Sequence, residues 1–124
     1  MTGIARMRSV VLDTPDPDAL AEFYRRLLGG SIVSAVDDWV ELEFEPGRRL
    51  AFQRAGEFRP PTWPTGERPQ QFHLDVTVDD IDAAEPAVLA IGAEKHEVQP
   101  GEIDGAPFRV YLDPAGHPFC LCWD

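Results

Sequence analysis

The sequence predicts an α+β fold made of two β-α-β-β-β modules, and three observations lead to this prediction. A chain of 124 residues has room for one domain of ordinary size. Strand-like runs and helix-like stretches follow one another in the order β-α-β-β-β, twice over. The two halves can also be overlaid at a constant offset, which matches Ser9 with His73 and Asp16 with Asp80. Neither half can close a core alone, so we expect a single domain over residues 1–124.

The first module, residues 5–54, starts with a β-branched run over residues 8–13 that favours a strand. The helix after it has strong start signals, because Thr14 or Asp16 can cap it and Pro17 suits its first position. Two glycines stop this helix, and apolar residues at helical spacing give it one buried face. Three further strands are expected over residues 31–36, 39–44 and 50–54.

Residues 55–70 are rich in proline and glycine and show no usable periodicity, so we interpret them as the linker between the modules. Phe58, Trp63 and three prolines are unusual in a solvated spacer. We expect this segment either to fold over a site or a subunit boundary, or to pack as a strap on the seam between the modules.

The second module, residues 71–124, repeats the pattern. Residues 72–78 favour a strand, and the helix after them is expected to end near Gly92. Pro86 is tolerable in this helix only if it lies in the first turn. Gly116 is available for a positive φ in the last hairpin turn. Further strands are expected over residues 94–98, 108–113 and 119–123.

Charge and composition argue against several classes of partner. The chain carries 11 basic and 22 acidic residues, and its net charge of −11 repels nucleic acid. It contains no run of about 18 apolar residues and no apolar signal stretch at the start, so we expect a cytoplasmic protein without membrane contact. Cys120 and Cys122 lie two apart on one expected strand, where a mutual disulfide is awkward, so both are expected as thiols.

Alternation along each expected strand separates a face covered by the helix from an opposite face that suits a ligand. On residues 72–78, the ligand face carries His73, Asp75 and Thr77. Mixed aromatic, polar and ionisable side chains on this face are typical of a ligand pocket. The predicted pocket for a small molecule is lined by Trp39, Gln53, His73, Arg109, Tyr111 and Cys120.

The same rule divides the strand over residues 108–113. It assigns Phe108 and Val110 to the helix side, and Arg109 and Tyr111 to the ligand side. There Arg109 and Tyr111 can orient an anionic or carbonyl-bearing ligand, although Arg109 can equally pair with a surface carboxylate.

Three motifs together resemble the vicinal oxygen chelate superfamily, which includes glyoxalases, bleomycin-resistance proteins and extradiol dioxygenases. They are the helix segment AEFYRRLLG, the strand HLDVTVDD and the turn LDPAGHPF, and the resemblance extends from about Arg6 to Trp123. It implies that both modules form a cup. It also implies a divalent metal bound by one ligand from the first and last strand of each module, and a homodimer.

Carried over residue by residue, the ligand positions fall at Ser9 (or Arg8, if the alignment shifts), Gln53, His73 and Cys120. His73 alone is a usual ligand of the family. Serine binds metals poorly, and the mixed set suits no common catalytic ion, so a metal is disfavoured. If a metal is present, we expect Gln53, His73 and Cys120 to hold it.

His73 has three candidate roles, as a metal ligand, as a general base and as a residue that lines a metal-free pocket. Asp75 shares its face, but about 7 Å along one strand is too far for a direct orienting bond. Glu41 is a second candidate for proton transfer, or part of a solvated face. Cys120 is either a nucleophile or, as we favour, a small buried thiol.

Two functions therefore remain open at this stage. The first is a small-molecule-binding protein with a metal-free pocket. The alternative is a lyase or isomerase of the glyoxalase type, in which His73 and Gln53 hold a metal or His73 and Glu41 move protons beside a carbonyl. Whether the protein is an enzyme stays open.

Overall fold

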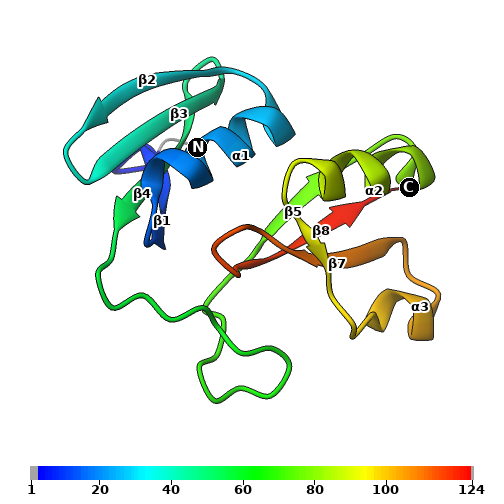
Figure 1. Ribbon diagram of the computed structural model, residues 1–124. Coiled ribbons are helices and arrows are strands. Elements are labelled where there is room, and N and C mark those ends of the chain that lie inside the picture. Colours follow the sequence, from blue (N-terminus) through cyan, green and yellow to red (C-terminus); the bar gives the residue numbers. More distant parts are fainter. Residues whose placement is uncertain (1–2, 124) are drawn as a thin grey trace. The chain divides into compact units, whose positions relative to one another are not determined.

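The computed structural model describes residues 3–123, which divide into two compact units between Phe58 and Arg59. Each unit contains one four-stranded sheet together with its helices (Figure 1). The predicted α+β class with two β-α-β-β-β modules is confirmed. The expectation that both modules belong to one domain stays a prediction.

The first unit contains one helix and four strands. They are β1 (Ser9–Thr14), α1 (Pro17–Leu28), β2 (Ser31–Val36), β3 (Trp39–Glu45) and β4 (Arg48–Arg54). The strand order is β1-β4-β3-β2, with β1 parallel to β4 and the other neighbours antiparallel. Helix α1 packs against β3 and β4 (Figure 1), and the ring of Tyr24 stacks on Phe52 at 5.7 Å to form the centre of the core.

Asp16, and not Thr14, caps α1. Its Oδ1 accepts a hydrogen bond from the backbone N–H of Ala19 at 3.2 Å. Thr14 instead accepts from the backbone N–H of Asp16 at 3.1 Å, which fixes the residue before the helix. Pro17 occupies the first position and Gly29 ends the helix at a φ of 85°, as the sequence predicts.

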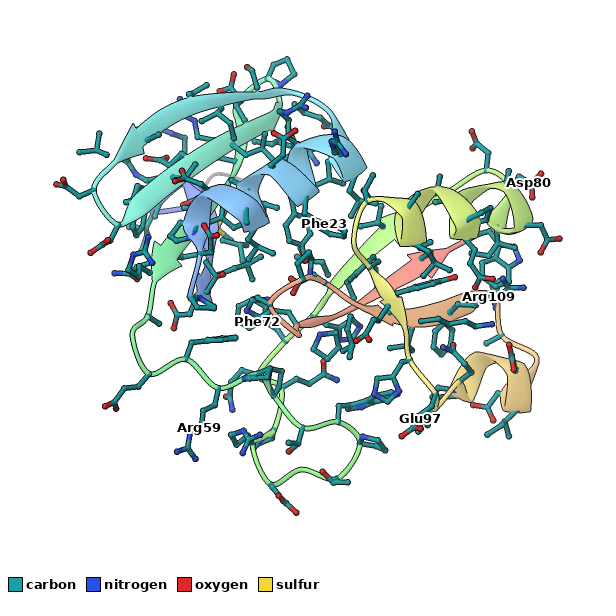
Figure 2. All side chains as sticks on the ribbon, viewed as in Figure 1. Phe23, Arg59, Phe72, Asp80, Glu97 and Arg109 are labelled. Atoms are coloured by element: carbon teal, nitrogen blue, oxygen red, sulfur yellow. The ribbon has the colours of Figure 1, made fainter. Side chains whose placement is uncertain are left out.

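The second unit has the same strand order. Its elements are β5 (Leu74–Thr77), α2 (Ile81–Ala90), β6 (Glu94–Lys95), α3 (Pro100–Asp104), β7 (Phe108–Leu112) and β8 (Pro118–Cys122). The order β5-β8-β7-β6, with β5 parallel to β8, repeats that of the first sheet. This correspondence confirms the internal repeat. Asp80, which lies at the start of α2 (Figure 2), caps this helix as Asp16 caps α1, whereas the short helix α3 has no counterpart in the prediction.

The strand predicted over residues 94–98 is wrong in length, since β6 contains only two residues. The Gln99 side chain instead pairs with the edge of β7 that a longer β6 would cover. The Gln99 amide donates to the carbonyl of Val110 at 2.8 Å and accepts from its N–H at 2.9 Å. The buried Gln99 side chain thus takes the place of a strand backbone beside β7.

Pro86 does not lie in the first turn of its helix, so this prediction is also wrong. It is the sixth residue of α2, where proline removes the hydrogen bond to the carbonyl of Asp82. Because Pro86 is exposed, water can satisfy that carbonyl.

The proline-rich residues 59–70, here called the 59–70 segment, belong to the second unit. The carbonyl of Trp63 lies 3.1 Å from Nε2 of His96, and the indole meets the imidazole edge to face at 5.0 Å. Pro60 crosses Gly116, where a Cβ would approach the proline Cβ to 2.6 Å. Glycine at this turn, with a φ of 94° as predicted, therefore gives the segment room to pass. None of the helices within residues 3–123 is long and apolar enough to span a bilayer.

Candidate functional site

The register of the second sheet brings a row of side chains together on one face. Asp75 lies opposite Cys120, and Cys120 opposite Val110, across the strands β5, β8 and β7. The next row contains Cys122 opposite Phe108. Arg109 and Tyr111, which alternate with Phe108 and Val110 on β7, contact Glu85 of α2. Both rows therefore lie on the face of the sheet opposite this helix.

This face forms one wall of a cavity of about 470 Å³. The cavity belongs to the second unit, and its walls combine aromatic side chains and prolines with polar groups and two thiols. The lining residues are Trp63, Gln70, His73, Asp75, Pro100, Pro107, Phe108, Val110, Pro118, Cys120, Cys122 and Trp123. Size and lining both correspond to a small-molecule site.

His73 and Asp75 are in direct contact, with 3.1 Å between Nε2 and Oδ1. The expectation that about 7 Å along the strand is too far for a direct bond is wrong. The two side chains share one face of the sheet, and they lean towards each other along the strand. They are 39% and 63% exposed, so solvent or a ligand reaches both groups. This pair is the polar end of the cavity.

Cys120 lies beside the pair and is buried. Burial, with the negative charge of Asp75 as the next cause, raises the pKa of the Cys120 thiol to about 12. The thiol is therefore protonated at neutral pH, which supports the interpretation as a buried thiol over that as a nucleophile.

Gln70 contributes an unpartnered acceptor to the cavity. Its Oε1 is buried and has no hydrogen-bond partner among the described residues. A buried acceptor without a partner costs about 1–3 kcal/mol, so a donor on a bound molecule would relieve this cost.

Arg109 and Tyr111 face α2, and the predicted division of this strand is wrong. The Tyr111 hydroxyl donates to Glu85 Oε1 at 2.7 Å, and Arg109 Nη1 donates to the same oxygen at 3.2 Å. Phe108 and Val110, assigned to the helix side, line the cavity instead. The rule failed because the cavity is itself apolar, so hydrophobicity does not distinguish its wall from the core.

The contacts of Glu85 change the acidity of the groups around it. The hydrogen bond from Tyr111, together with the charges of Lys95 and Arg109, lowers the pKa of Glu85. Burial and the neighbouring Glu85 carboxylate raise the pKa of Tyr111. The cluster is a charged contact between α2 and the sheet.

The predicted residues of the first unit lie on the face of its sheet opposite α1. Trp39 is the cross-strand neighbour of Gln53, and its indole N–H donates to Glu41 Oε2 at 3.0 Å. Arg49 pairs with Glu41 at 3.5 Å. This pairing is typical of a charged surface, and the roles of Trp39, Glu41 and Gln53 in binding or catalysis stay predictions.

The register also shows which residues correspond between the modules. Val11 lies opposite Ala51 in the first sheet, as Asp75 lies opposite Cys120 in the second. The counterpart of Cys120 is therefore Ala51 and not Gln53, which corrects the assignment from the sequence. Because a methyl group and the Ser9 hydroxyl stand at the first-module positions, the residues do not fit the four-ligand metal site of the superfamily.

Several cavity residues were missed in the sequence, and one signal points to some of them. Phe108 lies opposite Cys122 as Trp39 lies opposite Gln53, so extending the repeat through the third strand aligns two aromatic residues. Gln70 lies in an aperiodic segment, where no pattern could identify it.

Comparisons with known proteins agree with this architecture. No curated protein matches the chain significantly. A glyoxalase/bleomycin resistance protein/dioxygenase family enzyme from Burkholderia phytofirmans aligns with a TM-score of 0.70 at 19% identity, over 96% of this chain and 98% of that one. A glyoxalase family protein from Enterococcus faecalis aligns with a TM-score of 0.71 at 17% identity, over 96% and 98%.

A glyoxalase-related enzyme from Fulvimarina pelagi aligns with a TM-score of 0.65 at 17% identity, over 98% of this chain and 89% of that one. At these identities the structures establish the fold alone. The family model of the glyoxalase-like domain, however, matches residues 9–122, which is nearly the whole chain. The chain therefore belongs to the glyoxalase-like domain family, within the vicinal oxygen chelate superfamily.

Proposed function

We propose that this protein binds a small organic molecule with a flat apolar part in the cavity of the second unit. The observation that carries the proposal is the cavity of about 470 Å³, which is within the usual range for ligand sites. Its walls include the aromatic rings of Trp63, Phe108 and Trp123. Aromatic side chains supply large contact areas to flat ligands, and stacking adds about 0.5–1.5 kcal/mol beyond area burial.

Polar groups at this site favour a ligand with one hydrogen-bond donor. Gln70 Oε1 has no partner among the described residues, and Asp75 is a further acceptor. None of the described residues that line the cavity is lysine or arginine, so a carboxylate or phosphate would lack a cationic partner. A neutral aromatic alcohol or amine fits these features best.

The test uses 2-naphthol as a neutral aromatic probe with one O–H donor. Isothermal titration calorimetry is expected to give one saturable site per chain. The Phe108→Ala variant should bind at least about fivefold more weakly, equivalent to about 1 kcal/mol, because an aromatic wall is lost. Phe72→Ala is the matched control, since Phe72 is 61% exposed and does not line the cavity. Absence of binding, or equal weakening in both variants, would contradict the proposal.

A second candidate is an enzyme that moves a proton next to a carbonyl, and the 3.1 Å contact between His73 and Asp75 favours it. A carboxylate that accepts from Nε2–H leaves Nδ1 as a base. Asp75 then takes the partner role that Glu41 had in the prediction, and no ion of the four-ligand site is required. Deuterium exchange into hydroxyacetone, followed by NMR in D₂O, should be at least tenfold slower with His73→Gln. Exchange no faster than in buffer would exclude this candidate.

A further inference from the structure

We propose that His73, Asp75 and Cys120 bind one zinc-type transition-metal ion within the second unit, with no ligand from the first. This site differs from the four-ligand site of the superfamily, because it uses Asp75 and lies in one module. It goes beyond the proposed function, since the apolar walls can hold an organic ligand without an ion. Compared with the ligands expected from the sequence if a metal is present, which are Gln53, His73 and Cys120, the proposed set contains Asp75 in place of Gln53.

The distances are compatible with one ion. Single ligand atoms of the three side chains all lie within 4.8 Å of one another, and His73 Nε2 is 3.1 Å from Asp75 Oδ1. A tetrahedral zinc ion with bonds of about 2.0–2.3 Å separates its ligand atoms by about 3.3–3.8 Å. Side-chain shifts of about 1 Å therefore suffice. The backbone can stay in place, because Asp75 and Cys120 are already partners in a regular parallel pair.

The donor set identifies the class of ion. One imidazole nitrogen, one thiolate sulfur and one carboxylate oxygen suit zinc or cobalt, which accept mixed nitrogen, sulfur and oxygen ligands. Magnesium and calcium prefer oxygen alone, so a set with a thiolate and an imidazole discriminates against them. Three protein ligands leave a fourth position for water or a bound molecule, as in catalytic zinc sites.

The charge around the site also favours a cation. No lysine or arginine is among the described residues that line the cavity. The nearby cations Lys95 and Arg109 pair with Glu85 on the opposite face of the sheet. A divalent ion would compensate the Asp75 carboxylate, and its binding would release the proton of the Cys120 thiol to the solvent.

The experiment titrates Co²⁺ into the full chain after removal of the affinity tag and of bound metal by a chelator. We expect one Co²⁺ per chain, a thiolate-to-cobalt charge-transfer absorption and a higher Tm. Asp75→Asn should weaken binding at least tenfold, and Asp79→Asn, an exposed carboxylate outside the cavity, should not. Cys120→Ser should abolish the charge-transfer absorption, whereas Cys122→Ser should retain it.

Circular dichroism checks that each variant is folded. Since Asp75 is exposed, Asp75→Asn keeps the test decisive even if the buried Cys120→Ser variant unfolds. No Co²⁺ binding, equal affinity in Asp75→Asn and wild type, or an absorption that depends on Cys122 would overturn the proposal. Because this titration contains the ion alone, its failure is distinguishable from a failure of 2-naphthol to bind.

Discussion

His73 and Asp75 form the polar end of the cavity, and the register between two parallel strands places Cys120 beside them. Asp75 is the register partner of Cys120, and His73 lies two residues before it on the same face. The carboxylate therefore contacts the imidazole and lies close to the thiol. The hydrogen bonding of His73 and the acidity of Cys120 therefore both depend on Asp75.

Cys120 should react slowly with iodoacetamide in the metal-free folded chain. Its pKa is raised to about 12, against about 8.5 for an unfolded thiol, so little thiolate exists at pH 8. In the Cys122→Ser variant, mass spectrometry should find alkylation at least a hundredfold slower in buffer than in concentrated urea. Similar rates in both conditions would show that Cys120 is neither buried nor protonated.

Tyr111→Phe should lower the free energy of unfolding at pH 7 by about 1–2 kcal/mol, because Glu85 loses a hydrogen bond to its charged form. The folded-state pKa of Glu85 is lowered, so its contribution is present above the unfolded pKa of about 4.3 and is lost as the pH falls through the folded value. Urea unfolding of wild type and variant should therefore differ less at pH 3.5 than at pH 7. An equal difference at both pH values would contradict this explanation.

At the scale of elements, the helix caps and most strands could be predicted, but one division of faces could not. Asp16, Pro17 and Gly29 are local signals, and the structure uses all three. For β7, hydrophobic alternation gave the reverse of the observed faces, because Phe108 lines an apolar cavity while Tyr111 is buried under α2. Alternation indicates two faces, and it does not say which one a helix covers.

The 59–70 segment depends on His96. The backbone N–H of Val98 donates to His96 Nδ1 at 3.0 Å, so Nε2 carries the proton and donates to the carbonyl of Trp63. His96→Ala should increase hydrogen exchange of the amides of residues 62–68, since it removes both this bond and the ring contact. Glu97→Ala, an exposed neighbour, is the control. Unchanged exchange in His96→Ala would mean that other contacts hold the segment.

Pro86→Ala should stabilise α2. Alanine restores the N–H that can bond to the carbonyl of Asp82, and Pro86 is exposed, so no packing is lost. We expect the free energy of unfolding to rise by about 1–3 kcal/mol in urea titrations. A decrease would show that proline contributes more by restricting the unfolded chain.

At the scale of the whole molecule, the internal repeat was the most useful sequence signal, and it also shows where the modules diverge. Ser9 and Ala51 in one sheet correspond to His73 and Cys120 in the other. The overlay predicted the repeated order of elements. The ligand positions carried over from the superfamily, however, placed Gln53 where Ala51, two residues earlier, is the counterpart of Cys120. The register of parallel pairing depends on hydrogen bonds between distant strands, which a short apolar run does not specify.

Binding of a small molecule in the cavity of the second unit can be observed residue by residue in a ¹H–¹⁵N correlation spectrum of the labelled chain during titration with 2-naphthol. The amides of Val110, Cys120 and Cys122 should shift in a saturable manner, because these residues line the cavity. The amides of β2 in the first unit should stay in place. Absence of concentration-dependent shifts, or shifts confined to residues outside the cavity, would show that the cavity does not bind this ligand.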